Sequence, residues 1–148
     1  MIKPRSRIFL IALILLAGLA AVAWCQERYA VSVSIANIRK GPAESYDILW
    51  QVEKYYPVQV MEKQGDWYKF KDYEGDQGWI HNSLLDQTDT VIVKKEECNV
   101  RQGPGTNFPV AFRAQNGVPF RVINVKGDWV HIRHADGDDG WIYKPLIW

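Results

Sequence analysis

The chain contains one set of motifs twice, 62 residues apart, and the two copies align without a gap. The stretch NIRKGP at residues 37–42 returns as NVRQGP at 99–104, and GDWYKFKDYEGDQGWI at 65–80 returns as GDWVHIRHADGDDGWI at 127–142. A fixed period indicates that one supersecondary unit was duplicated. The repeated positions hold turn formers, aromatic residues and residues typical of buried strands. No nucleophile and no metal-ligand cluster repeats, which favours a binding module over an enzyme.

Each copy has the pattern of a small antiparallel β-barrel. Short alternating or β-branched stretches predict strands at 29–35, 48–52, 58–61, 67–71 and 78–80, and then at 90–93, 110–112, 120–125, 129–133 and 140–142. A long loop follows each Gly-Pro pair, and Gly65-Asp66 predicts a tight hairpin turn. We therefore expect an all-β fold of two tandem five-stranded barrels, at residues 29–85 and 89–148, preceded by an N-terminal hydrophobic signal helix. No segment after Ala23 shows a helical apolar stripe.

The N-terminus has the layout of a secretory signal peptide. Lys3, Arg5 and Arg7 precede an apolar run at residues 8–23, which ends in the possible cleavage motif AVA. The run is shorter than the roughly 20 residues that a transmembrane helix needs. Residues 1–23 are thus predicted to be a signal peptide that directs export to the periplasm or cell envelope. An uncleaved anchor in the inner membrane and a lipid on Cys25 are the alternatives.

The net charge limits the classes of partner that the chain can bind, and the two cysteines raise the question of a disulfide. Loss of the leader takes the formal net charge from +1 to −2, and neither copy carries an excess of more than two charges of one sign. Nucleic-acid binding needs a strongly basic surface, so no nucleic-acid partner is expected, and membrane contact is expected only through an uncleaved leader. A disulfide between Cys25 and Cys98 would suit an exported chain. Because Cys98 aligns with Ala36, a buried thiol in place of a small side chain is favoured.

The order of these motifs resembles the bacterial SH3-like (SH3b) domain family. The pattern is N-x-R-x-G-P, an aromatic residue (Tyr46 or Phe108), G-D-W and then G-x-x-G-W, and it runs through nearly all of both copies. The resemblance implies an SH3-type barrel in each copy, a bacterial envelope setting and a non-catalytic role. It also implies peptide segments of peptidoglycan as a class of ligand. In cell-wall hydrolases such domains accompany a catalytic domain, whereas no chemistry is expected of this chain.

Aromatic side chains supply the candidate binding surface. Tyr46 and Phe108 lie in the long loops, where an aromatic groove would accept an extended peptide. Trp67 and Trp129 lie on the strand face opposite the predicted core, so they are either ligand platforms or hairpin anchors. The first copy is the more aromatic one and is the preferred binder. The candidate ligand-binding residues are Tyr46, Trp50, Trp67 and Tyr73 in the first copy and Phe108, Phe112 and Trp129 in the second.

The remaining polar residues favour structural roles. Arg39 and Arg101 are expected to fix the long loops through hydrogen bonds to backbone carbonyls, with contact to a ligand carboxylate as the alternative. The three histidines do not repeat between the copies, so no metal, cofactor or catalytic site is expected from them. We expect an exported protein that recognises peptidoglycan or its peptide portion. A scaffold or accessory subunit that docks an envelope protein is the alternative, suggested by the change of Tyr55-Tyr56 into Gly117-Val118.

Overall fold

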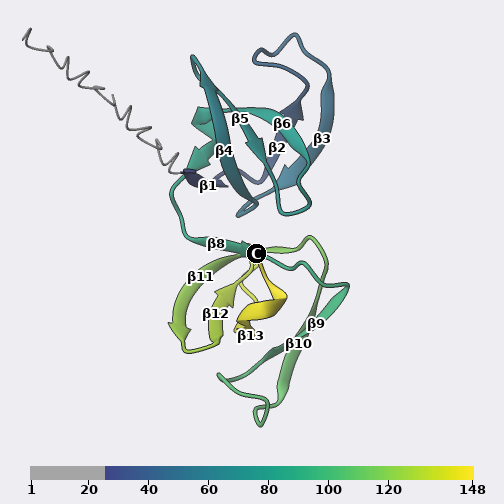
Figure 1. Cartoon of the computed structure of the whole chain (residues 1–148). Coiled ribbons are helices and arrows are strands. Elements are labelled where there is room, and N and C mark those ends of the chain that lie inside the picture. The colour runs from purple at the N-terminus through teal and green to yellow at the C-terminus, as the bar shows by residue number, and fades with distance from the viewer. Residues whose placement is uncertain (1–25) are drawn as a thin grey trace, which may run out of the picture.

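The computed structural model describes residues 26–148 as two all-β modules, and the predicted leader and Cys25 lie outside the described residues. The first module contains β1 (Arg28–Val31), β2 (Ile35–Arg39), β3 (Ile48–Glu53), β4 (Pro57–Gln64), β5 (Trp67–Lys71), β6 (Gln77–His81), the 3₁₀ turn η1 (Asn82–Leu84) and β7 (Leu85–Asp86). The second contains β8 (Thr90–Ile92), β9 (Glu97–Arg101), β10 (Val110–Gln115), β11 (Pro119–Lys126), β12 (Trp129–Arg133), β13 (Asp139–Tyr143) and η2 (Lys144–Leu146). Figure 1 shows the modules one above the other, with β8 and the C-terminus at the boundary between them.

Each module is an open antiparallel sheet with an edge strand on either side. The strand order is β3-β2-β6-β5-β4-β1-β7 in the first module and β10-β9-β13-β12-β11-β8 in the second. The prediction of closed five-stranded barrels was wrong in this respect, because the two end strands of each sheet do not pair with each other. A single bridge, between Arg39 and Trp79 in the first module and between Arg101 and Trp141 in the second, joins the two halves of each sheet. The all-β class and its duplication are confirmed.

The first predicted strand is in fact two strands separated by a bend. The stretch from Tyr29 to Ile35 alternates throughout, but the chain bends at residues 32–34. Before the bend, β1 pairs with β4 and β7, and after it β2 pairs with β3 and β6. The bend thus carries one continuous segment from one end of the sheet to the other. Asn37 and Arg39 lie inside β2, before the long loop.

The hairpin turns follow the sequence pattern. Gly65 and Gly127 adopt φ values of 58° and 55°, in the left-handed region that glycine enters without a steric penalty. Each begins a two-residue turn, between β4 and β5 or between β11 and β12. The turns set the register in which Lys63 faces Tyr68 and Val125 faces Val130, and a shift of register farther along each hairpin then brings Val60 opposite Phe70 and Val122 opposite Ile132.

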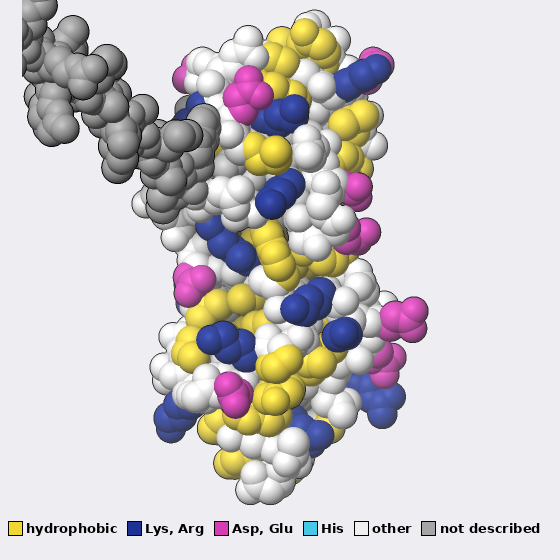
Figure 2. All heavy atoms as spheres, viewed as in Figure 1, with side chains coloured by type: hydrophobic (Ala, Val, Ile, Leu, Met, Phe, Trp, Pro, Cys, Tyr) yellow, Lys and Arg dark blue, Asp and Glu magenta, His cyan; other side chains and the backbone are white. Residues whose placement is uncertain are grey.

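Each module encloses its own hydrophobic core. Ile38, Val58, Phe70 and Ile80 are fully buried in the first module, and Val100, Phe120, Ile132 and Ile142 have 1% exposure or less in the second. Most of these residues come from the strands that the alternation predicts. Ile92 crosses between the two cores: it belongs to β8 of the second module but is buried in the core of the first. Figure 2 shows hydrophobic side chains continuing across the boundary between the modules.

Within the described residues, no helix has the length and apolar character required to cross a membrane.

Cys98 is buried in the second core, and burial raises the pKa of its thiol. Both observations agree with the prediction that Cys98 takes the place of a small packed residue.

Candidate functional site

A surface hollow recurs at equivalent positions of the two modules. We call them the Trp67 hollow and the Trp129 hollow. The first has a volume of about 300 Å³ and is lined by Ile35, Ala36, Asn37, Arg39, Glu44, Trp67, His81, Ser83 and Leu84. The second has a volume of about 630 Å³ and is lined by Glu97, Cys98, Asn99, Arg101, Gly105, Thr106, Asn107, Trp129, Tyr143 and Leu146. Eight of the nine residues of the first set have their aligned partner in the second set.

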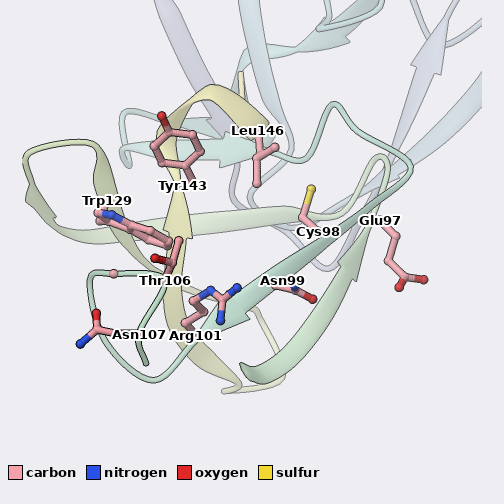
Figure 3. Close-up of a pocket in the computed structure, with 10 residues that line it drawn as sticks. Glu97, Cys98, Asn99, Arg101, Thr106, Asn107, Trp129, Tyr143 and Leu146 are labelled. Carbon is pink, nitrogen blue, oxygen red and sulfur yellow. The ribbon is translucent and has the colours of Figure 1, made fainter. Parts of the chain in front are cut away.

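Three strands, the long loop and a 3₁₀ turn build each hollow. In Figure 3, Asn99 and Arg101 come from β9, Trp129 from the start of β12, Tyr143 from the end of β13, and Thr106 and Asn107 from the long loop. Alternation along β9 places Asn99 and Arg101 on the same face of the strand. Because the hairpin turn ends just before Trp129, the indole lies beside them at the surface.

The Trp side chains are half-buried, and each is supported by an aromatic neighbour. The ring of Trp67 meets His81 edge-on with 5.2 Å between centroids, and Trp129 lies 5.5 Å from Tyr143. His81 is held in turn by Ser83, whose Oγ lies 2.6 Å from the histidine Nδ1. A supported indole with one face toward solvent offers a rigid apolar surface for a ligand.

The arginines hold the long loops, as the sequence predicted. Arg39 Nη1 donates to the carbonyl oxygens of Glu44 and Tyr46 at 2.9 and 3.0 Å. Arg101 Nη1 donates to the carbonyl oxygen of Phe108 at 3.0 Å. Only Nη1 takes part in these bonds, and a guanidinium carries five N–H donors in all. The same arginines therefore support the loop and line the hollow.

Polar groups of both signs surround each indole. The Trp67 hollow combines Arg39 with Glu44, and the Trp129 hollow combines Arg101 with Glu97. Glu97 also pairs with Arg113 at 3.0 Å. Such a surface offers donors and acceptors to peptide amides, and opposite charges to the two ends of a zwitterion. In the described part of the chain, no group of three or more His, Cys, Asp or Glu side chains is arranged to hold a metal ion.

The seven candidate residues from the sequence divide into three sets. Trp67 and Trp129 line the repeated hollows. The rings of Tyr46 and Phe108 are 45% and 38% exposed and lie against Gly41 and Gly103 in the loops, so close that a Cβ on either glycine would overlap the ring.

The other three candidates pack against the cores. Trp50 meets Phe70 edge-on at 6.4 Å, and Tyr73 meets Tyr56 at 6.4 Å. Phe112 lies 6.2 Å from Phe120 and lines a separate hollow of the second module. Their roles as ligand contacts stay predictions, as does the groove proposed along Tyr46, Trp50 and Tyr73.

Several residues of the hollows were not singled out from the sequence as ligand contacts. They include Asn37 and Asn99, Leu84 and Leu146, and His81, which looked like a solitary surface histidine. The repeated N-x-R motif was the available signal, since period 2 puts Asn and Arg on one strand face. Its proximity to Trp67 depends on pairing between β2 and β6, which joins residues 40 positions apart and has no local signature.

Comparison with known proteins shows which protein family the chain belongs to. The family model described as bacterial SH3 domain matches residues 32–87 and again residues 94–148. A protein named as an N-acetylmuramoyl-L-alanine amidase, YrvJ of Bacillus subtilis strain 168, is 26% identical over 139 residues. That match covers 86% of this chain and 27% of YrvJ. A protein named as a cell wall amidase, LytH of Staphylococcus epidermidis, is 31% identical over 61 residues, which is 40% of this chain and 21% of LytH.

The chain thus spans about a quarter of the length of these curated relatives or less. Among solved structures, an NlpC/P60 family protein from Bacillus cereus aligns at 14% identity with a TM-score of 0.40, covering 82% of this chain and 56% of that one. That TM-score is too low to bear on fold or function. The two family-model matches together cover most of the sequence, and the chain belongs to the bacterial SH3 domain family, with two copies in tandem.

Proposed function

We propose that this chain is an exported, non-catalytic binding protein of the bacterial cell envelope, and that its repeated hollows bind the peptide portion of peptidoglycan. The observation that carries the proposal is the recurrence of one hollow, with an indole, an Asn and an Arg, at equivalent positions of both modules. The names of the two relatives, which mention the cell wall and an amidase, support the envelope as the setting. The predicted leader supports export.

The chemistry of the hollow suits a short peptide with charged ends. An indole and the neighbouring leucine contact aliphatic side chains, while Asn and Arg donate to carbonyl and carboxylate oxygens. A glutamate in each hollow attracts an ammonium group. Two weak sites on one chain gain avidity on a polymer that repeats the same peptide, by a factor of about 10² to 10⁴ when both bind at once.

The proposal predicts how tryptophan substitutions change retention on purified sacculi. Trp67→Ala and Trp129→Ala should each weaken binding about tenfold or more, because each removes the central apolar contact of one hollow. The double variant should lose both the sites and the avidity. Retention is measured in a pull-down at several protein concentrations.

Tyr46→Ala is the matched control, since its ring is exposed in the loop and the Trp67 hollow does not include it. A loss with Tyr46→Ala that equals the loss with Trp67→Ala would move the site to the aromatic groove predicted from the sequence. Wild-type protein that does not stay on sacculi would refute wall binding. Turnover of a wall substrate by the chain would refute the non-catalytic role.

Docking of an envelope protein is the second candidate function. The observation that favours it is the difference between the modules at Tyr55-Tyr56 and Gly117-Val118. Two copies that bind one repeating ligand have no need to differ there. Crosslinking in cells separates the two functions: one dominant protein adduct supports docking, and a diffuse wall-linked product supports peptide binding.

A further inference from the structure

The second module has another hollow, which lies apart from the Trp129 hollow and shares no residue with it. We call it the Phe112 hollow. Its volume is about 290 Å³, and it is lined by Phe112, Arg113, Ala114, Gln115, Val118, Phe120, His134, Asp136 and Asp138. Three rings form a continuous aromatic wall: Phe112 lies 6.2 Å from Phe120, and Phe120 meets His134 edge-on at 5.5 Å. Such a wall favours a planar, apolar group.

In the first module, a tyrosine side chain fills the equivalent place. Tyr56 aligns with Val118 and is only 9% exposed. Its hydroxyl donates to Asp72 Oδ2 at 2.8 Å, and Asp72 aligns with His134. A second ring, that of Tyr73, meets Tyr56 edge-on at 6.4 Å.

The second module has lost both of these rings, and its neighbouring positions differ as well, since Phe112, Phe120 and His134 stand in place of Trp50, Val58 and Asp72. Val118 and Ala135 stand in place of Tyr56 and Tyr73, and the hollow beside Val118 opens to the surface. The loss of filling side chains leaves apolar surface in contact with water, which a ligand of matching shape would cover. The first module shows that a tyrosine ring packs at this end of the fold, with its hydroxyl bonded to residue 72.

The same end of the module already serves as a contact surface in the first copy. Tyr73 hydroxyl donates to Asn116 Oδ1 of the second module at 2.8 Å. This bond joins two modules through a tyrosine at the rim of the place that Tyr56 fills. In the second module, Ala135 offers no such contact, so the corresponding rim is open to another polypeptide.

The rim of the Phe112 hollow carries a negative charge. Asp136 and Asp138 both line it and are exposed, and the guanidinium of Arg113 is paired with Glu97 at 3.0 Å. Asp136 Oδ1 accepts from the backbone N–H of Asp138 at 3.0 Å and lies 3.0 Å from His134 Nδ1. His134 Nε2 takes part in none of these contacts and is the ring nitrogen available to a hydroxyl.

We infer that the Phe112 hollow binds a tyrosine side chain of a partner protein, in a segment where lysine or arginine flanks the tyrosine. The aromatic wall selects the ring, and the two aspartates select the flanking cations. This inference does not depend on peptide binding in the repeated hollows.

Three peptides test this inference by NMR titration of the ¹⁵N-labelled full chain. The probes are acetyl-Lys-Tyr-Lys-amide, acetyl-Glu-Tyr-Glu-amide and acetyl-Lys-Ala-Lys-amide. The first should shift the amide signals of residues 112–120 and 134–138 at millimolar concentration and bind about fivefold more tightly than the second, as expected for exposed ion pairs. The alanine peptide should cause no shift there. Equal shifts with the tyrosine and alanine peptides, or shifts confined to the Trp129 hollow, would overturn the inference.

Two variants locate the binding. Val118→Tyr installs the side chain that fills the first module and should abolish the shifts, while retention on sacculi stays at the wild-type level. Asp136→Asn combined with Asp138→Asn changes only exposed side chains and should reduce the affinity for the lysine-flanked peptide to that for the glutamate-flanked one. Binding that survives Val118→Tyr in a folded protein would contradict the inference. If Val118→Tyr does not fold, the aspartate double variant decides, and an unchanged preference for the lysine-flanked peptide contradicts the inference.

Discussion

At the scale of single residues, the pair formed by Tyr56 and Asp72 shows how the first module stabilises a polar group inside its core. Asp72 is 6% exposed, and its Oδ1 accepts the backbone N–H groups of Glu74 and Asp76 at 2.9 Å each. Its Oδ2 accepts the hydroxyl of Tyr56. Burial, followed by this hydrogen bond, raises the pKa of Tyr56 far above its usual value. The phenol therefore stays protonated and serves as a permanent donor.

Removal of that donor has a predictable cost. Tyr56→Phe leaves one oxygen of a buried carboxylate without its partner, so the free energy of unfolding should fall by about 1 to 3 kcal/mol. Urea denaturation followed by tryptophan fluorescence measures the change. Tyr46→Phe is the matched control and should change stability by less than about 0.5 kcal/mol, because that ring is exposed. A cost below that of the control would show that the hydrogen bond does not stabilise the fold.

At the scale of elements, one glycine in β6 and one in β13 let the two halves of each sheet approach. A Cβ on Gly78 would lie 2.3 Å from Ile38 Cγ2, and a Cβ on Gly140 would lie 2.7 Å from Val100 Cγ1 and 2.8 Å from the carbonyl oxygen of Arg101. Ile38 and Val100 are fully buried, so they have no free space into which to move. This close approach is what places the N-x-R strand beside Trp67 and Trp129.

Alanine at either glycine should therefore force the strands apart. We expect Gly78→Ala and Gly140→Ala each to lower the free energy of unfolding by about 1 to 3 kcal/mol, as overpacking of a core does. Chemical denaturation gives the values, and the exposed neighbour in Gln77→Ala should cost less than about 0.5 kcal/mol. A Gly140→Ala variant as stable as wild type would mean that the sheet halves are less tightly packed than the contacts indicate.

At the scale of the whole molecule, the modules meet along a seam formed by Arg28, Tyr73, Thr90, Ile92, Asn116 and Trp148. The Arg28 guanidinium lies 4.1 Å from the centre of a Trp148 ring and donates to the carbonyl oxygens of Trp148 and Thr90 at 2.9 and 3.2 Å. Trp148 packs against the core of the first module although it is the last residue of the second. A cation over an indole, with charge-assisted hydrogen bonds, makes a specific contact between the modules.

The seam predicts that both modules unfold together. The wild-type chain should show one calorimetric transition, and Trp148→Ala should separate it into two, because the substitution removes the ring that covers the first core and pairs with Arg28. Differential scanning calorimetry measures this. Arg113→Ala, which removes only an exposed ion pair, should keep the single transition. Two transitions in the wild-type chain would show that the modules are thermodynamically independent.

The local pattern predicted the parts of the fold that depend on near neighbours. The Gly65-Asp66 turn and the strand from Trp67 to Lys71 are set by the φ freedom of glycine and by alternation, and both were predicted. The bend at residues 32–34 was missed because alternation continues through it. The sheet ends and the seam were missed because pairs such as Arg28 and Trp148 lie 120 positions apart.

The candidate site was predicted in part for the same reason. Trp67 and Trp129 were recognised as aromatic residues on an outward face, which depends on period 2 alone. Trp50 has the same residue type but packs edge-on against Phe70, and only the tertiary structure separates the two cases. The Phe112 hollow lies where the aligned copies differ, with Val118 in place of Tyr56. The effect of that difference could not be predicted, because it depends on the position of Tyr56 in the tertiary structure.

The contact of Arg28 with Trp148 also bears on the proposed binding of ligands that are long enough to reach both modules. Since the seam keeps the modules packed together, the Trp67 and Trp129 hollows lie at a constant separation. Under the proposed function, a stiff strand whose repeat length matches that separation would occupy both hollows without any loss of domain freedom. A strand with a different spacing would engage one hollow at a time, so the pair of modules would select its ligand by periodicity as well as by chemistry.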